Sequence, residues 1–220
     1  MCGRFTRYHI WKEVHDYLSL FSTTASNLQP RYNIAPTTDC EVVREGDGGR
    51  EMFTARWGLL PHWAKDIKFG AKTFNARSET VAEKPSFRDA FKKRRCVIPA
   101  SGYYEWRTES GKKQPYHFTI PDQPVMVFAG LWEENKRVAE DPIVSFTILT
   151  TDANKTVSDY HHRMPVLLDQ EGIAAWMDED AGVDDMEQLM LPFAGDIEVT
   201  AANPKVGRVK EQGADLIGSG

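Results

Sequence analysis

The chain has 220 residues, of which 41% are hydrophobic and 27% are charged, as is typical of a globular protein. Its net charge of −5 argues against indiscriminate nucleic-acid binding. No apolar run approaches the roughly 20 residues that span a membrane, and the opening segment MCGRFTRYHIW lacks the apolar region of a signal peptide. We therefore expect a cytoplasmic protein with no membrane partner.

The N-terminal half predicts two helices and a hairpin. Apolar residues at positions 10, 14, 17, 18 and 21 have the spacing of a helix. Residues 41–60 predict a β-hairpin whose turn is the Gly-rich GDGG. The segment from Ser86 to Asp89 resembles a capping box, which predicts a short helix that ends near Lys93.

The C-terminal half predicts short strands separated by turn residues, followed by two helices. The strands are expected at residues 96–100, 103–107, 115–120, 125–133, 143–151 and 164–168. The helices are expected at residues 170–178 and 183–191. Because strands and helices do not alternate, the predicted class is α+β, with mostly antiparallel sheet and peripheral helices. No linker or repeat is visible, so residues 1–220 are expected to form one domain.

The sequence predicts neither a metal site nor a nucleotide cofactor. Three cysteines without a C-x-x-C pair (Cys2, Cys40 and Cys96) support neither a zinc site nor a disulfide framework. The adjacent His161 and His162 point to opposite sides of an extended chain, which makes them a poor chelate. There is also no G-x-G-x-x-G or phosphate-binding loop.

Charge is distributed unevenly along the chain. Residues 1–115 hold 20 Lys or Arg and 13 Asp or Glu, a balance of +7, whereas residues 116–220 hold 7 and 19, a balance of −12. The run 84–95 has six basic residues and one acid. A surface polarised in this way could hold a polyanion on one side, although a charge run by itself is more often a solvated helix face.

Cys2 lies directly behind the initiator methionine, where a cysteine that only packs is not expected. Methionine aminopeptidases act when the second residue is small, so removal of Met1 would give Cys2 a free α-amine beside its thiol. The reference pKa values of these groups are about 7.7–8.0 and 8.5, so both are partly nucleophilic near neutral pH.

Three further stretches place polar groups where packing alone would not require them. In FNARSET, Asn75 and Arg77 share one face of an extended segment. In SGYYEWR, Glu105 lies among aromatic residues, a setting that raises a carboxyl pKa. In DYHHRMPVLL, His161 precedes an apolar strand. Taken singly, each has a structural explanation: a turn cap, an edge-strand carboxylate or a surface histidine.

Together with MCGRF, these stretches resemble the SOS response-associated peptidase (SRAP) family, also called abasic-site processing proteins. The resemblance covers nearly the whole chain in family order. The matching segments are MCGRF (1–5), RYNIAPT (31–37), RWGLLPHWAKD (56–66), FNARSET (74–80), RCVIPASGYYEW (95–106), FAGLWE (128–133), HRMPVLL (162–168) and VGRVKEQGADLI (206–217).

The resemblance implies a single α+β domain with a twisted, barrel-like antiparallel core, and a Cys2 that crosslinks covalently to abasic sites in single-stranded DNA. Asn75 and Glu105 match the family's N-A-R and G-[YF]-[YF]-E-W motifs. His161 matches the family histidine by its spacing from the R-M-P run, and His162 occupies a position where the family often has Asp. The implied catalytic residues are therefore Cys2, Asn75, Glu105 and His161.

The expected partner is single-stranded DNA that contains abasic sites, bound by a monomer that is nucleoid-associated when on DNA. Arg4 and Arg77 match family arginines that bind phosphates, and the basic run 84–95 is a further candidate. Trp63 and Trp106 are candidates for stacking on bases, although Trp63 follows Pro61 and could equally be a core residue.

The groups suggest a sequence of steps. His161 would protonate the ring oxygen of the abasic sugar, and the Cys2 amine would attack the exposed aldehyde in lyase-like Schiff-base chemistry. Glu105 would assist loss of water, the Cys2 thiol would close a thiazolidine, and Asn75 would position the amine or a sugar hydroxyl. The alternatives are a cysteine peptidase that uses Cys2, including self-removal of Met1, and a non-catalytic reader of single strands.

Overall fold

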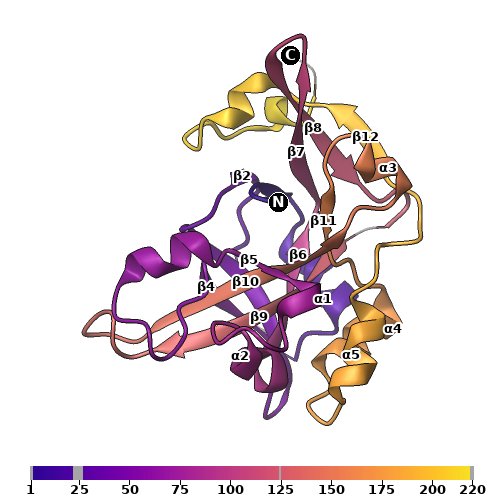
Figure 1. The fold of residues 1–220 in the computed structure, drawn as a ribbon. Helices are drawn as coiled ribbons and strands as arrows, with labels where there is room; N and C mark the ends of the chain where they lie inside the picture. Colours follow the sequence, from indigo (N-terminus) through magenta and orange to yellow (C-terminus); the bar gives the residue numbers. More distant parts are fainter. Residues whose placement is uncertain (1, 22–26, 124, 219–220) are drawn as a thin grey trace.

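The computed structural model describes residues 2–21, 27–123 and 125–218. Two β-sheets form the centre of the molecule, and short helices lie around them (Figure 1). Most strand pairs are antiparallel, which confirms the predicted α+β class with peripheral helices. In the described part of the chain, no helix is long and apolar enough to cross a membrane.

The first sheet has five strands in the order β12-β8-β7-β1-β2, and all of its pairings are antiparallel. Its strands are β1 (Phe5–Arg7), β2 (Arg31–Ile34), β7 (Gly102–Glu109), β8 (Lys112–Thr119) and β12 (Glu198–Ala201). The β7–β8 hairpin extends to the top of Figure 1. Because β1 pairs with both β7 and β2, the beginning of the chain is held against the centre of this sheet.

The second sheet closes on itself as a barrel. Five strands pair in the ring β10-β4-β3-β6-β9-β10, and only the β10–β4 pair within that ring is parallel. These strands are β3 (Asp39–Gly46), β4 (Gly49–Trp57), β6 (Arg95–Ala100), β9 (Met126–Asn135) and β10 (Ile143–Asp152). Two short strands, β5 (Asn75–Arg77) and β11 (Arg163–Pro165), also pair with β10. The ring confirms the barrel-like core.

The barrel strands are apolar on both faces because each face meets a different layer. On β9, Val127 and Ala129 pack in the cluster that includes the helices, whereas Phe128 packs in a second cluster. This division follows the period-two alternation of a strand. The second cluster joins barrel residues to residues of the first sheet, and it contains Cys2 and Phe5.

Strand β11 ends earlier than the predicted strand at 164–168. The N–H groups of Val166 and Leu168 donate to the carbonyl oxygens of Leu149 and Val127, at 3.0 Å in both cases. After Pro165 the hydrogen-bond partner of the chain therefore changes from β10 to β9, and this change ends the strand.

The predicted helices are present as α1 (Trp11–Leu18), α2 (Arg88–Lys93), α4 (Gln170–Met177) and α5 (Val183–Leu189). The capping box predicted for α2 is wrong. The residue before its first turn is Phe87, whose side chain makes no capping hydrogen bond. The Lys84 carbonyl instead accepts from the N–H groups of Phe87 and Arg88, both at 2.9 Å, so Ser86 lies within a preceding turn.

Several short elements were not expected from the sequence. Strands β1, β2 and β12 have three or four residues each, too few for a clear alternation. The remaining short elements are α3 (Lys155–Ser158), η1 (Ile67–Lys72), η2 (Ser78–Thr80), η3 (Pro204–Gly207) and η4 (Ala214–Leu216).

Candidate active site

Cys2 is fully buried between the two sheets, although it stands almost at the beginning of the chain. The fixed pairing of β1 with β7 holds it there, and its thiol lies 4.0 Å from the Arg4 carbonyl oxygen. Burial raises the pKa of the Cys2 thiol far above its ordinary value. The thiol is therefore protonated at neutral pH, and it needs a base before it can act as a nucleophile.

Glu105 on β7 is 4% exposed, and burial raises its pKa from 4.5 to about 7. The predicted increase in the pKa of Glu105 is confirmed, but only one of the three neighbouring aromatic residues lies on the same face of β7 as this carboxyl group. Tyr104 and Trp106 are one residue away on the strand and so point to the opposite face, whereas Tyr103 shares the face of Glu105. A carboxyl group with a pKa of about 7 can both give and accept a proton under physiological conditions.

His161 lies next to this carboxyl group. Its Nδ1 is 3.9 Å from Glu105 Oε1, and the N–H of Arg163 donates to Nδ1 at 3.0 Å. Nδ1 is also 3.1 Å from the Arg163 carbonyl oxygen, so the backbone of Arg163 offers this nitrogen both a donor and an acceptor. Burial lowers the pKa of His161, whereas His162 is exposed and stacks on His161 with ring centroids 4.4 Å apart. The geometry supports His161 as the functional histidine.

Asn75 opens β5, opposite Ile148 of β10. Its side-chain amide is buried, and neither Oδ1 nor Nδ2 has a hydrogen-bond partner among the described residues. A buried amide that is left unpaired costs free energy and needs an explanation. A ligand that supplies both a donor and an acceptor would satisfy it, as the predicted positioning function requires.

Arg163 joins the segments that carry Asn75 and His161. Its guanidinium binds Glu79 Oε1 at 2.6 Å and Asp152 Oδ1 at 2.7 Å, and it donates to the Thr150 carbonyl at 2.7 Å. These contacts tie η2, just after β5, to the end of β10 and to β11. In the sequence, Arg163 serves only to locate the R-M-P run. Its position directly before an apolar strand is the one feature that indicates a buried arginine with acidic partners.

The predicted phosphate contacts have different environments. Arg77 is exposed at the end of β5. Arg4 is half-buried, and its Nη1 donates to Asn33 Oδ1 at 2.7 Å and to the Val206 carbonyl at 2.6 Å. Arg4 therefore joins the segment just before β1 to β2 and η3, so part of its hydrogen-bonding capacity is used within the fold.

Two residues of the basic run 84–95 are structural. Arg95 is 8% exposed and donates to the carbonyl oxygens of Trp176 at 2.7 Å and Phe91 at 3.0 Å. Arg94 pairs with Glu133 at 2.7 Å. These two arginines are therefore engaged within the fold, which leaves fewer basic residues of the candidate run 84–95 for phosphate contacts.

Of the predicted stacking residues, Trp63 is the more accessible. It is 38% exposed and meets Phe69 edge-on, with ring centroids 5.2 Å apart, so it is not a core residue. The segment that carries Trp63 runs from Gly58 to Gly70, and these two glycines lie in close contact. Only glycine fits at position 58, because its φ is 132° and a Cβ there would lie 2.4 Å from the Gly70 carbonyl oxygen. Trp106 packs in a small cluster with Tyr104 and residues of the C-terminal segment.

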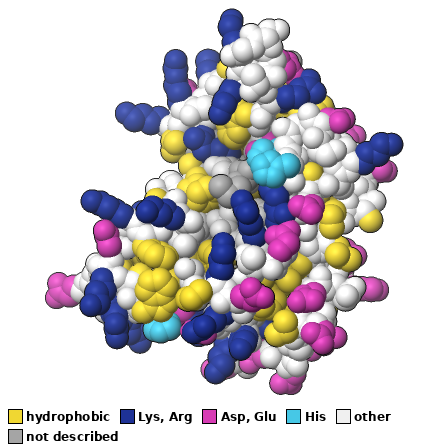
Figure 2. Space-filling view, viewed as in Figure 1, with side chains coloured by type: hydrophobic (Ala, Val, Ile, Leu, Met, Phe, Trp, Pro, Cys, Tyr) yellow, Lys and Arg dark blue, Asp and Glu magenta, His cyan; other side chains and the backbone are white. Residues whose placement is uncertain are grey.

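The visible surface agrees with the charge asymmetry of the sequence. Figure 2 shows Lys and Arg side chains at the upper left, at the left and through the centre of this face, whereas Asp and Glu are most frequent at the right and lower right. This arrangement gives a polyanion a favourable approach to the left and centre of this face.

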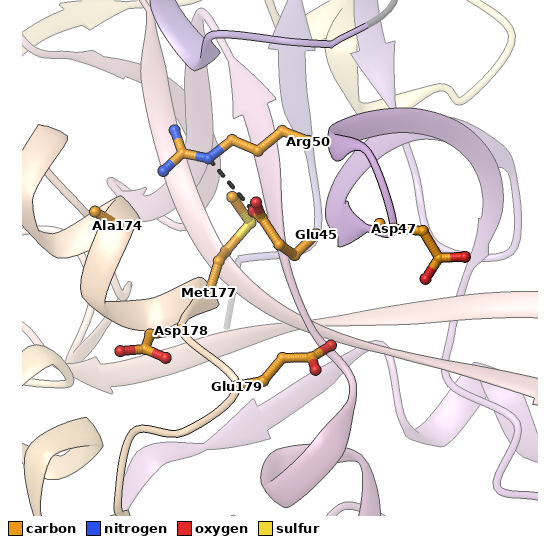
Figure 3. Close-up of a pocket in the computed structure, with 8 residues that line it drawn as sticks. Glu45, Asp47, Arg50, Ala174, Met177, Asp178 and Glu179 are labelled. Atoms are coloured by element: carbon orange, nitrogen blue, oxygen red, sulfur yellow. Dashed lines mark ion pairs between the residues drawn. The ribbon is translucent and has the colours of Figure 1, made fainter.

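A separate cavity of about 510 Å³ lies between the β3–β4 turn and the end of α4. Its described lining carries four carboxylates and one guanidinium, that of Arg50, which pairs with Glu45 at 3.6 Å (Figure 3). The excess of negative charge opposes binding of a nucleic-acid backbone. This cavity is therefore a poor candidate for a DNA site.

Comparison with known proteins identifies related chains along the whole sequence. Residues 1–209 match the family described as SOS response associated peptidase (SRAP). Abasic site processing protein YoaM of Bacillus subtilis is 35% identical over 221 residues, covering 99% of this chain and 97% of that protein. Abasic site processing protein HMCES of Xenopus tropicalis is 32% identical and covers 68% of this chain and 54% of that protein.

Solved structures share the fold. A protein from Bacteroides thetaiotaomicron superposes with a TM-score of 0.84 at 25% identity, covering both chains completely. A protein from Bordetella bronchiseptica superposes with a TM-score of 0.80 at 28% identity, covering 92% of this chain and all of that one.

Proposed function

The chain belongs to the SRAP family, and we propose that it processes abasic sites in single-stranded DNA by forming a covalent thiazolidine crosslink through Cys2 after Met1 is removed. Relatives named abasic site processing proteins support the DNA lesion as substrate. The observation that carries the chemistry is the buried Glu105, which has a pKa of about 7, lies 3.9 Å from His161 and shares the site with Cys2.

The first steps use the Glu105–His161 pair. An abasic deoxyribose is mostly a closed hemiacetal, and opening it requires a proton at the ring oxygen. His161 in its protonated form supplies that proton and takes up the proton that the anomeric hydroxyl group loses as the ring opens, so that Glu105, 3.9 Å away, still holds its own proton for the later step. The free Cys2 amine then adds to the aldehyde carbon to give a carbinolamine.

Loss of water from the carbinolamine gives an iminium ion, and Glu105 donates the proton that leaves with the hydroxide. Asn75 suits a positioning function in this step, since its buried amide can hold the amine or a sugar hydroxyl. The Cys2 thiol then adds to the iminium carbon and closes a five-membered ring. Only an N-terminal cysteine can form this ring, because it requires an amine and a thiol on adjacent carbons.

Peptide hydrolysis by Cys2 has weaker support. The α-amine has no function in that reaction, and burial raises the pKa of the thiol, which opposes the thiolate that a cysteine peptidase needs. Non-catalytic binding of single strands would account for the basic surface but not for a carboxyl group tuned to a pKa of about 7 beside a histidine.

The test compares wild-type protein with Cys2→Ser on an abasic single-stranded oligonucleotide. Intact mass first establishes that Met1 is absent. We expect a heat-stable adduct from wild-type protein on a denaturing gel, and from Cys2→Ser only an imine that borohydride must trap. A heat-stable adduct of equal yield from Cys2→Ser would refute the thiazolidine.

A further inference from the structure

Tyr103 carries a hydroxyl group that packing does not explain. The residue is completely buried, and its Oη has no hydrogen-bond partner among the described residues. An unpaired buried hydroxyl costs free energy, and phenylalanine would fill the same space without that cost. The neighbouring Tyr104 provides a contrast, since its hydroxyl donates to the Tyr32 carbonyl oxygen at 2.9 Å.

The strand directs this hydroxyl group towards the site. Tyr103 and Glu105 are two residues apart on β7 and therefore share a face, opposite to that of Tyr104. The Tyr103 ring is fixed by stacking on Phe118, with centroids 4.9 Å apart and an interplanar angle of 13°. Cys2 packs in the same buried cluster as Tyr103.

The electrostatics of the cluster keep this hydroxyl group a donor. Burial raises the pKa of Tyr103 well above 10, and negative charge on Cys2 or Glu105 raises it further. When either neighbour ionises, the phenol therefore stays protonated and can donate a hydrogen bond to the new charge.

We propose that Tyr103 is a further catalytic residue, whose hydroxyl donates a hydrogen bond to the Cys2 sulfur as the thiol loses its proton and closes the ring. This inference rests on the proposed function. In the step, the S–H bond breaks and the S–C1′ bond forms. The proton passes to the Glu105 carboxylate, which gave up its own proton during loss of water, and the π electrons of the iminium remain on nitrogen as the ring amine. No oxidant or reductant is needed.

The experiment separates imine formation from ring closure. Tyr103→Phe removes one oxygen atom and keeps the ring, and Tyr104→Phe is the matched control on the other face. Each protein, with Met1 shown absent by mass, is mixed with an abasic single strand. Borohydride trapping follows the imine, and heat-stable adduct without reductant follows closure.

We expect Tyr103→Phe to form the imine at the wild-type rate but to close the ring about 10–100-fold more slowly, the effect of losing a hydrogen bond to a charged group. Tyr104→Phe should close at the wild-type rate, and Tyr103→Phe should be at least as heat-stable as wild type. Ring closure by Tyr103→Phe at the wild-type rate would overturn the inference. Two other results would also overturn it: equal slowing of imine formation and ring closure in Tyr103→Phe, or equal slowing of closure in Tyr103→Phe and Tyr104→Phe. Absence of a heat-stable adduct from wild-type protein would overturn the proposed function itself.

Discussion

Replacing Glu105 with glutamine should stabilise the protein at alkaline pH and leave its stability almost unchanged in mild acid. The folded state raises the pKa of this carboxyl group from 4.5 to about 7 because it is buried. Between these two values the folded chain binds more protons than the unfolded chain, so the free energy of unfolding falls as the pH rises. Above about pH 7 the loss is complete.

The magnitude follows from the shift. About 2.5 pKa units at 1.36 kcal/mol each correspond to about 3 kcal/mol of destabilisation by ionised Glu105. Glutamine keeps the shape without the charge. For a chain of this size, a gain of about 3 kcal/mol would raise the melting temperature by roughly 6–12 °C at pH 8.

Urea or thermal unfolding of wild type and Glu105→Gln at pH 5 and pH 8 measures this difference. The matched control is Glu198→Gln, because Glu198 is exposed on β12 and should show no pH-dependent gain. An equal effect of Glu105→Gln at both pH values would refute the reasoning, since it would locate the effect in packing instead of ionisation.

Two further predictions concern the reaction and the substrate. His161→Ala should slow crosslinking by about 10²–10⁴-fold, whereas His162→Ala should not, because it is His161 that lies 3.9 Å from Glu105. A time course of adduct formation measures both rates, and equal slowing by the two substitutions would contradict this assignment. Trp63→Ala should weaken binding of single-stranded DNA by about 1–3 kcal/mol, as measured by fluorescence anisotropy at fixed salt. Ile67→Ala removes another exposed apolar side chain and should leave binding unchanged. Equal losses of binding free energy in the two variants would argue against stacking of Trp63 on a base.

The sequence predicted the elements that have enough residues to show a period. Helix α1 follows from apolar spacing, and the β3–β4 hairpin and the later strands follow from apolar runs separated by turn residues. Strand β1 was not predicted, because three residues carry no recognisable alternation. This omission matters for the site, since the pairing of β1 with β7 is what buries Cys2. A terminal cysteine therefore looked exposed in sequence and proved to be inside the fold.

The candidate site was predictable in its residue types but not in its electrostatics. The aromatic setting of Glu105 suggested a raised pKa, yet two of the three aromatic neighbours lie on the opposite face of the strand. The shift comes from burial of the Glu105 side chain in the folded chain, which is a tertiary property. For the same reason, the basic run 84–95 overstated the charge available to DNA, because the sequence does not show that Arg95 is surrounded by carbonyl oxygens.

Burial of the site also sets the order in which the two nucleophiles of Cys2 would act. The raised thiol pKa keeps the sulfur protonated while Glu105 still holds its own proton, so the amine reacts with the aldehyde first. Loss of water then leaves Glu105 as a carboxylate, and a base for the thiol exists only from that moment. One carboxyl group with a pKa of about 7 can therefore serve both steps. The instability expected from ionising Glu105 is a consequence of the burial that gives it this pKa.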